Sequence, residues 1–89
     1  MAIIKKKTWP DLFEAVLTGQ KKFDLRLADF DAVSGDTLIL EEFNPETKTY
    51  TGRRVEKRIS YVLKFNPANY PFASAEEVSK YGLQILSLD

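Results

Sequence analysis

The chain has 89 residues, the size of one small domain, and its 13 basic and 13 acidic side chains cancel. It contains no cysteine and no histidine, which excludes disulfides, thiolate nucleophiles, histidine bases and histidine-bound zinc. No apolar run approaches the roughly 20 residues that a membrane-spanning helix needs. We therefore expect a single cytoplasmic domain over residues 1–89, with no cofactor, no metal and no membrane association.

A helix is predicted over residues 9–18, after a short strand that opens at Ile3. Its apolar residues recur at helical spacing, and they are Trp9, Leu12, Phe13, Val16 and Leu17. Thr8 is expected to cap the start, and Gly19 suits the left-handed position that follows a helix end. We expect the apolar stripe, Trp9 included, to pack in the core.

Four strands are predicted after this helix, each bounded by glycine or proline turns. They cover residues 22–28, 37–43, 50–65 and 83–88. A capping-box pattern predicts a short helix over residues 74–81, just before the last strand. The fold class is therefore α+β but mainly β, with about five mostly antiparallel strands. Such a sheet is expected to curl into a small β-barrel, because closure pairs the edge strands that an open sheet leaves exposed.

The strand at residues 50–65 alternates clearly along its length. The side chains predicted to share its apolar face are Val55, Ile59, Tyr61, Leu63 and Phe65. Gly52 lies inside this strand and predicts a bulge or a close backbone approach. A hairpin turn with Pro45 in its first central position precedes the strand.

The strand at residues 22–28 has an apolar side and a charged side. Apolar Phe23, Leu25 and Leu27 point one way. The opposite side carries Lys22, Asp24 and Arg26, with Lys21 just before it. This pattern suits a barrel strand with one face toward a groove, and we expect the charged side to look into a recess. The alternative is an ordinary solvated strand face with an internal ion pair.

Basic side chains gather in two clusters although the net charge is zero. The first cluster comprises Lys5, Lys6, Lys7, Lys21, Lys22 and Arg26, and the second comprises Arg53, Arg54, Lys57 and Arg58. If the two meet in space, a positive patch would form on a neutral protein. The second cluster would then follow a nucleic-acid backbone, or else its charges only prevent edge-to-edge aggregation.

Two other groups of residues are possible sites by their residue types. Tyr70 and Phe72 lie in a proline-rich loop, where they would stack on a base or close one end of the barrel. Asp29, Asp31 and Asp36 lack the spacing of a calcium loop, so no metal site is predicted.

The segment from Thr8 to Arg26 resembles the opening of ASCH domains, which belong to the PUA-like superfamily of small β-barrels. The family pattern there is a helix, then G-x-K-T and a strand that ends in arginine. Gly19, Lys21 and Arg26 match it, whereas Lys22 stands where the pattern has threonine. Three further blocks are similar in order: residues 33–38 (VSGDTL), 44–53 and 82–88 (GLQILSL). The block at 44–53 is similar to an uncharacterised, largely bacterial and phage subfamily.

The resemblance implies a PUA-like barrel with a cleft beside the helix and the G-x-K strand, which binds RNA or a modified nucleoside. Some ASCH proteins are amidohydrolases that deacylate N4-acetylcytidine with the G-x-K lysine, a threonine on the following strand and a distant glutamate. Lys21 matches the lysine, whereas Asp24 stands in place of the threonine. The glutamate falls in residues 66–80, which do not align.

The leading prediction is a small module, most simply a monomer, that recognises RNA or a nucleoside. Its expected binding residues are Lys21, Lys22, Asp24, Arg26, Arg53, Arg54 and Arg58. Asp24 would accept from an exocyclic amine or act as a base. If the protein is an amidohydrolase, Lys21 and Asp24 are the catalytic candidates. A third alternative is a protein-interaction module, which a large exposed apolar patch would favour.

Overall fold

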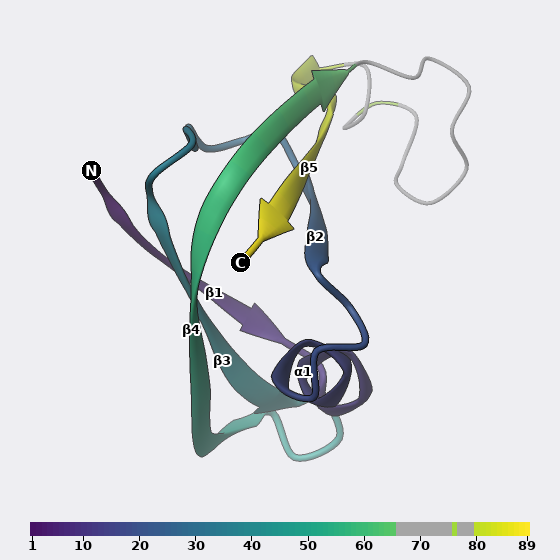
Figure 1. The fold of residues 1–89 in the computed structure, drawn as a ribbon. Helices are drawn as coiled ribbons and strands as arrows, with labels where there is room; N and C mark the ends of the chain where they lie inside the picture. The colour runs from purple at the N-terminus through teal and green to yellow at the C-terminus, as the bar shows by residue number, and fades with distance from the viewer. Residues whose placement is uncertain (66–75, 77–79) are drawn as a thin grey trace.

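Five strands form one mixed sheet, and a helix near the N-terminus lies beside it, in the computed structural model (Figure 1), which describes residues 1–65, 76 and 80–89. In chain order these are β1 (Ile3–Thr8), α1 (Pro10–Leu17), β2 (Phe23–Leu27), β3 (Thr37–Asn44), β4 (Thr49–Phe65) and β5 (Leu83–Leu88). The strand order is β1-β3-β4-β5-β2, in which only the β1–β3 pair is parallel. The prediction of a small, mainly β and mostly antiparallel fold is confirmed.

The sheet does not close into the expected barrel. Within the described ranges no ladder joins β1 to β2, so both remain sheet edges. The two strands are nevertheless brought near each other, because the sheet curves between them. The short helix expected over residues 74–81, together with Tyr70 and Phe72, lies largely outside the described residues.

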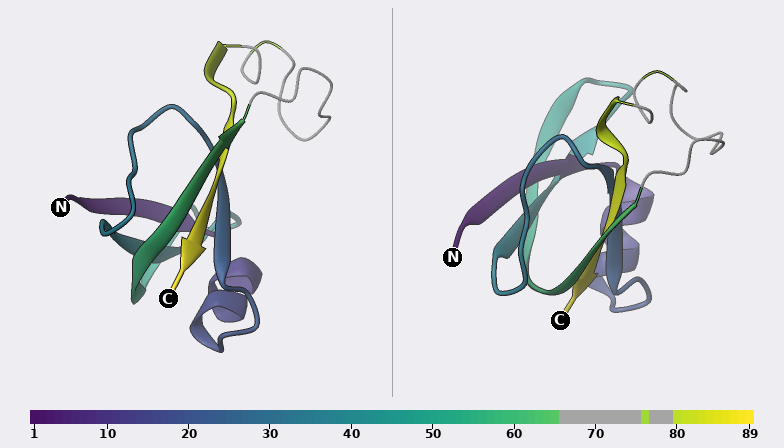
Figure 2. Two further views of the ribbon diagram at one scale, coloured as in Figure 1. Left: turned by 45° about the horizontal axis from the view of Figure 1, so that its top comes forward. Right: turned by 90° about the horizontal axis from the view of Figure 1, so that it is seen from above.

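The long strand β4 makes this curvature possible. Its first part pairs with β3 and its second part pairs with β5, and Figure 2 shows it curving from one part of the sheet to the other. Gly52 has φ +92° and lies where the register shifts between Glu41 and Phe43, so the predicted bulge is confirmed. A Cβ added to Gly52 would meet no atom within 4 Å, so this glycine does not serve a close backbone approach.

A second bulge in β4 reverses which side chains face the core. The register shifts between Ile59 and Tyr61, which inserts Ser60 as an extra residue. Ile59 is therefore buried and Val62 packs against the core, while Tyr61 and Leu63 are exposed. The prediction that these last two share the face of Ile59 is wrong, because one unpaired residue changes the side of every residue after it.

The core lies between α1 and the inner faces of β3, β4 and β5. Its buried members are Phe13, Val16, Ala32, Leu38, Leu40, Ile59, Leu86 and Leu88. From the predicted helical stripe only Phe13 and Val16 are buried, whereas Leu12 and Leu17 are exposed. An eight-residue helix thus contacts the core along a narrow strip. Gly19 has φ +84°, as expected of the residue after a helix end.

Asp36 fastens the loop before β3 to the N-terminal segment. One of its carboxylate oxygens accepts from the Ala2 backbone N–H at 2.8 Å, and the other accepts from the Val33 N–H at 3.0 Å. These two hydrogen bonds, aided by the N-terminal positive charge, lower the pKa of Asp36 below its usual value, against the opposing effect of burial. The charged carboxylate is thus the form that stabilises the fold.

We expect Asp36 to make the fold sensitive to acid. Because its pKa is lower in the folded than in the unfolded state, its stabilising effect is complete above the unfolded value near pH 4 and is lost as the pH falls further. Asp36→Asn should therefore have a lower Tm than the wild type at pH 7, and this difference should shrink at pH 3. Circular dichroism melts at both pH values measure it, with Asp31→Asn as an exposed control. A Tm difference independent of pH would contradict this role.

Candidate functional site

A cavity of about 540 Å³ lies between the two free edges of the sheet, where β1 leads into α1. We call it the seam pocket. Its lining residues are Lys7, Thr8, Trp9, Leu12, Lys21, Phe23, Asp24, Leu25 and Arg26. A volume of this size is typical of small-ligand sites. The pocket therefore lies between the charged residues of β2 and the junction of β1 with α1.

Asp24 is the centre of the polar part of the seam pocket. Its side chain is only 4% exposed, and one carboxylate oxygen accepts from Arg26 Nε at 2.6 Å. The other carboxylate oxygen lies 3.6 Å from Lys21 Nζ. The structure thus brings three of the predicted site residues together, with a buried anion holding two cations.

Arg26 also connects the two edges of the sheet. Its Nη2 donates to Thr8 Oγ1 at 3.2 Å, so a side-chain hydrogen bond links β2 to β1 where no backbone ladder does. Arg26 and Lys21 keep 23% and 17% of their side chains exposed. Both cations can therefore reach a ligand in the pocket without leaving Asp24.

The register with β5 explains why the charged side of β2 points inward. Asp24 lies opposite Leu86, and Arg26 lies opposite Gln84; both of these β5 residues are fully buried. Cross-strand partners share a face, so the charged side of β2 lies at the inner face of the sheet. Phe23 and Leu25 consequently face outward and are exposed.

Trp9 forms part of the apolar wall, contrary to the prediction that it lies in the core. It is 56% exposed, and its φ of −73° and ψ of 154° place it outside the helix. Pro10 explains this position, because the residue before a proline is pushed toward an extended conformation. Thr8 correspondingly remains the last residue of β1 and does not cap α1. The Trp9-Pro10 pair is the signal in the sequence from which the extended conformation of Trp9 and the place of Thr8 in β1 could have been predicted.

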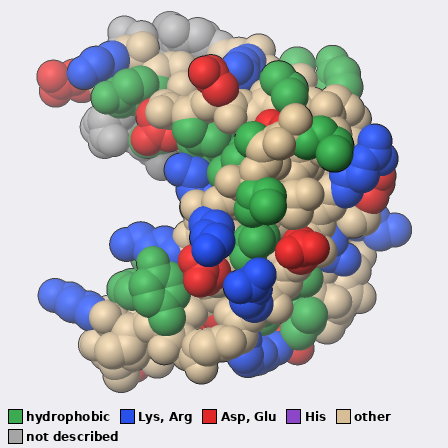
Figure 3. Space-filling view, turned by 90° about the vertical axis from the view of Figure 1, so that its left-hand side faces the viewer, with side chains coloured by type: hydrophobic (Ala, Val, Ile, Leu, Met, Phe, Trp, Pro, Cys, Tyr) green, Lys and Arg blue, Asp and Glu red, His purple; other side chains and the backbone are tan. Residues whose placement is uncertain are grey.

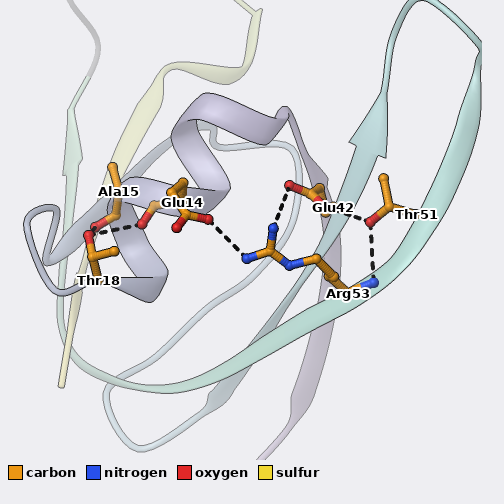
Figure 4. A network of polar contacts seen from close by, with 6 residues as sticks. All are labelled: Glu14, Ala15, Thr18, Glu42, Thr51 and Arg53. Carbon is orange, nitrogen blue, oxygen red and sulfur yellow. Dashed lines mark hydrogen bonds and ion pairs between the residues drawn. The ribbon is translucent and has the colours of Figure 1, made fainter.

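Arg53 does not line the seam pocket but connects α1 to the β3–β4 hairpin (Figure 4). Its guanidinium lies 2.9 Å from a Glu14 carboxylate oxygen and 3.7 Å from one of Glu42, and it stacks 5.0 Å from the Phe13 ring centroid. Thr51 Oγ1 donates to the buried Glu42 at 2.6 Å. The surroundings of Arg53 therefore indicate a structural role.

The remaining predicted basic residues also lie away from the seam pocket. Arg54 lies 4.0 Å from Glu56, and Arg58 lies 3.2 Å from Asp89. Lys22 contributes to a separate cavity of about 190 Å³, whose other charged residues are Lys21, Lys57 and Asp89. Figure 3 shows acidic side chains interspersed among the basic ones on one face of the molecule. The second cluster thus approaches the first at Lys57, but none of its members lines the seam pocket.

No group of three acidic side chains in the described part of the chain could hold a metal ion. No helix among those residues is long and apolar enough to cross a membrane.

Comparison with solved structures shows a likeness to the crystal structure of hypothetical protein PH0355. The TM-score is 0.72 at 14% sequence identity, over 100% of this chain and 98% of the other, and at this identity the likeness concerns the fold alone. No curated protein sequence matches the chain. Residues 3–74 match the family described as "Domain of unknown function (DUF3850)", which is more than half of the chain. The protein therefore belongs to the DUF3850 family.

Proposed function

We propose that the protein binds a nucleotide unit, within RNA or as a modified nucleoside, in the seam pocket. The observation that carries the proposal is the presence of an exposed tryptophan and a fixed pair of cations in one cavity. Trp9 offers a planar surface on which a base can stack, which is a common mode of single-stranded RNA recognition. Arg26 and Lys21 offer donors to phosphate or carbonyl oxygens.

Asp24 has a positioning role in this proposal. Its two carboxylate oxygens already face Arg26 and Lys21, so it fixes the direction of both cations. This arrangement favours a ligand that presents oxygen acceptors over one that presents an exocyclic amine to Asp24. Lys22, Arg53, Arg54 and Arg58 have no contact role, because none of them lines the pocket.

We also propose a relationship to ASCH domains, with the open sheet as a variant of the PUA-like barrel. The support comes from the position of the G-x-K lysine, since Lys21 and the strand-ending Arg26 line one pocket beside α1. That is the place where the resemblance expects a cleft.

Lys21→Ala tests the proposed ligand contact. We expect the affinity for cytidine monophosphate and for a short pyrimidine RNA to fall roughly 10- to 100-fold, because a hydrogen bond to a charged group contributes roughly 1.5–3 kcal/mol. Lys22→Ala is the matched control, since this neighbouring lysine does not line the seam pocket. Isothermal titration calorimetry at fixed salt measures both variants. Equal affinities of the two variants, or no binding by the wild type at millimolar ligand, would reject the proposal.

An amidohydrolase is the second candidate, favoured by the ammonium group of Lys21 beside a buried carboxylate. The reaction would add water across the amide bond of N4-acetylcytidine and release acetate and cytidine. Incubation followed by chromatography detects the cytidine, and Lys21→Ala should abolish its formation. An unaltered substrate peak with the wild type would contradict the amidohydrolase, and binding would remain as the proposed function.

A further inference from the structure

The outer face of the β2–β5–β4 part of the sheet is apolar. Because cross-strand partners point to the same side, the two antiparallel registers place nine side chains on this face. They are Phe23, Leu25 and Leu27 of β2, Leu83, Ile85 and Ser87 of β5, and Tyr61, Leu63 and Phe65 of β4. Eight of the nine are apolar or aromatic, with Ser87 as the exception. We call this surface the outer face.

Much of the outer face is exposed in the single chain. The exposed fractions are 61% for Tyr61, 46% for Leu63, 47% for Phe23 and 38% for Leu25. Scattered exposed hydrophobic residues are normal on a monomer, but a contiguous patch marks an interaction surface. The middle row here is continuous, since Leu25, Ile85 and Leu63 are direct neighbours across the three strands.

The patch extends beyond the sheet toward α1. Phe23 and Leu25 also line the seam pocket, where they meet the exposed Trp9 and Leu12. The exposed apolar residues of the outer face and of the adjoining pocket wall are Tyr61, Leu63, Phe23, Leu25, Trp9 and Leu12. Taking 150–250 Å² for each aromatic side chain, we find that the exposed parts of these six residues present roughly 500–600 Å² of apolar surface. That value lies at the upper end of what a typical monomer leaves uncovered, about 300–600 Å².

We infer that a second copy of this chain covers the outer face in an isologous dimer. A standard interface buries about 800 Å² on each partner, of which a little over half is apolar, or roughly 450 Å². The outer face and its extension supply that area. The formal net charge is zero, so two copies do not repel each other as strongly charged chains would.

Twofold symmetry can bury the outer face against itself. An axis near Ile85 places the middle row of one copy against the middle row of the other, as two sheets packed about 10 Å apart. At the edge of the contact, Tyr61 keeps an apolar ring inside and a hydroxyl toward water. This packing covers the face that a β2–β5–β4 layer otherwise leaves to solvent.

Sedimentation equilibrium and light scattering test the dimer. The wild type should show twice the chain mass of 10.2 kDa, and Leu63→Lys should halve it, because a charge would be buried at the centre of the contact. Leu17→Lys is the matched control, since this leucine is 43% exposed on α1, outside the outer face. It should leave the mass of the dimer unchanged.

Two results would overturn the inference. One is a measured mass of 10.2 kDa for the wild type at several hundred micromolar. The protein would then be a monomer, or a different partner would cover the outer face. The other is a folded Leu63→Lys that keeps the dimer mass. If that variant does not fold by circular dichroism, Tyr61→Asp at a more exposed position gives the same test. Neither substituted residue lines the seam pocket, so both variants change the dimer without removing a proposed nucleotide contact.

Discussion

Trp9→Ala is expected to weaken nucleotide binding about 10- to 100-fold, because stacking of a base on an aromatic side chain contributes roughly 1–3 kcal/mol. The fold should tolerate the change. Trp9 is 56% exposed and lies before the first helical residue, so less than half of its surface is buried and no helical residue is replaced. With roughly 100 Å² of covered indole, the free energy of unfolding should fall by no more than about 2–3 kcal/mol.

Calorimetric titration with cytidine monophosphate measures this effect. Trp9→Phe should recover most of the affinity, because a smaller ring still offers a stacking surface. Tyr50→Ala is the matched control, since Tyr50 is an exposed aromatic residue on β4 that does not line the seam pocket. In the wild type, quenching of the single tryptophan gives an independent measure. Wild-type affinity in Trp9→Ala would show that the base does not stack there.

Asp24→Ala is expected to lower the free energy of unfolding by about 3 kcal/mol. Removing one partner of a buried ion pair typically costs about 3–5 kcal/mol, because the remaining charge is left without compensation. The lower end of this range applies, since Arg26 and Lys21 remain partly exposed and can be hydrated. The loss should occur even without any ligand.

Urea unfolding measures this cost, provided that the m-value is unchanged. Asp89→Ala is the matched control, because Asp89 pairs with Arg58 on the surface and should cost no more than about 1 kcal/mol. A double-mutant cycle with Arg26→Ala then isolates the interaction energy of Asp24 with Arg26. A cost of Asp24→Ala as small as that of Asp89→Ala would mean that water still solvates the network.

The helix and all the strands of the described chain could be predicted within a few residues, because their signals are local. Helical spacing ends at Gly19, and a proline turn separates β3 from β4. The orientation of the outer face could not be predicted in this way. It depends on the bulge at Ser60 and on the pairing of β2 with β5. Neither feature can be predicted from the alternation of apolar and polar residues along a strand.

The candidate site was predictable only in part for the same reason. Lys21, Asp24 and Arg26 lie within six residues of one another, so one strand pattern and one family resemblance point to all three. Trp9 joins them through the approach of β1 to β2, which is a tertiary feature. The structural role of Arg53 could not be predicted, because its partner Glu14 lies 39 residues away in the sequence.

The position of β2 in the sheet bears on how the protein acquires its pocket during synthesis. In the part of the chain that the structure describes, its backbone ladder is with β5 alone, pairing Phe23 with Ser87 and Leu27 with Leu83. A nascent chain therefore carries Asp24 and Arg26 on an unpaired strand until β5 has left the ribosome. Contacts this distant in sequence form slowly, which exposes the apolar side of β2 to chaperones and to aggregation in the meantime.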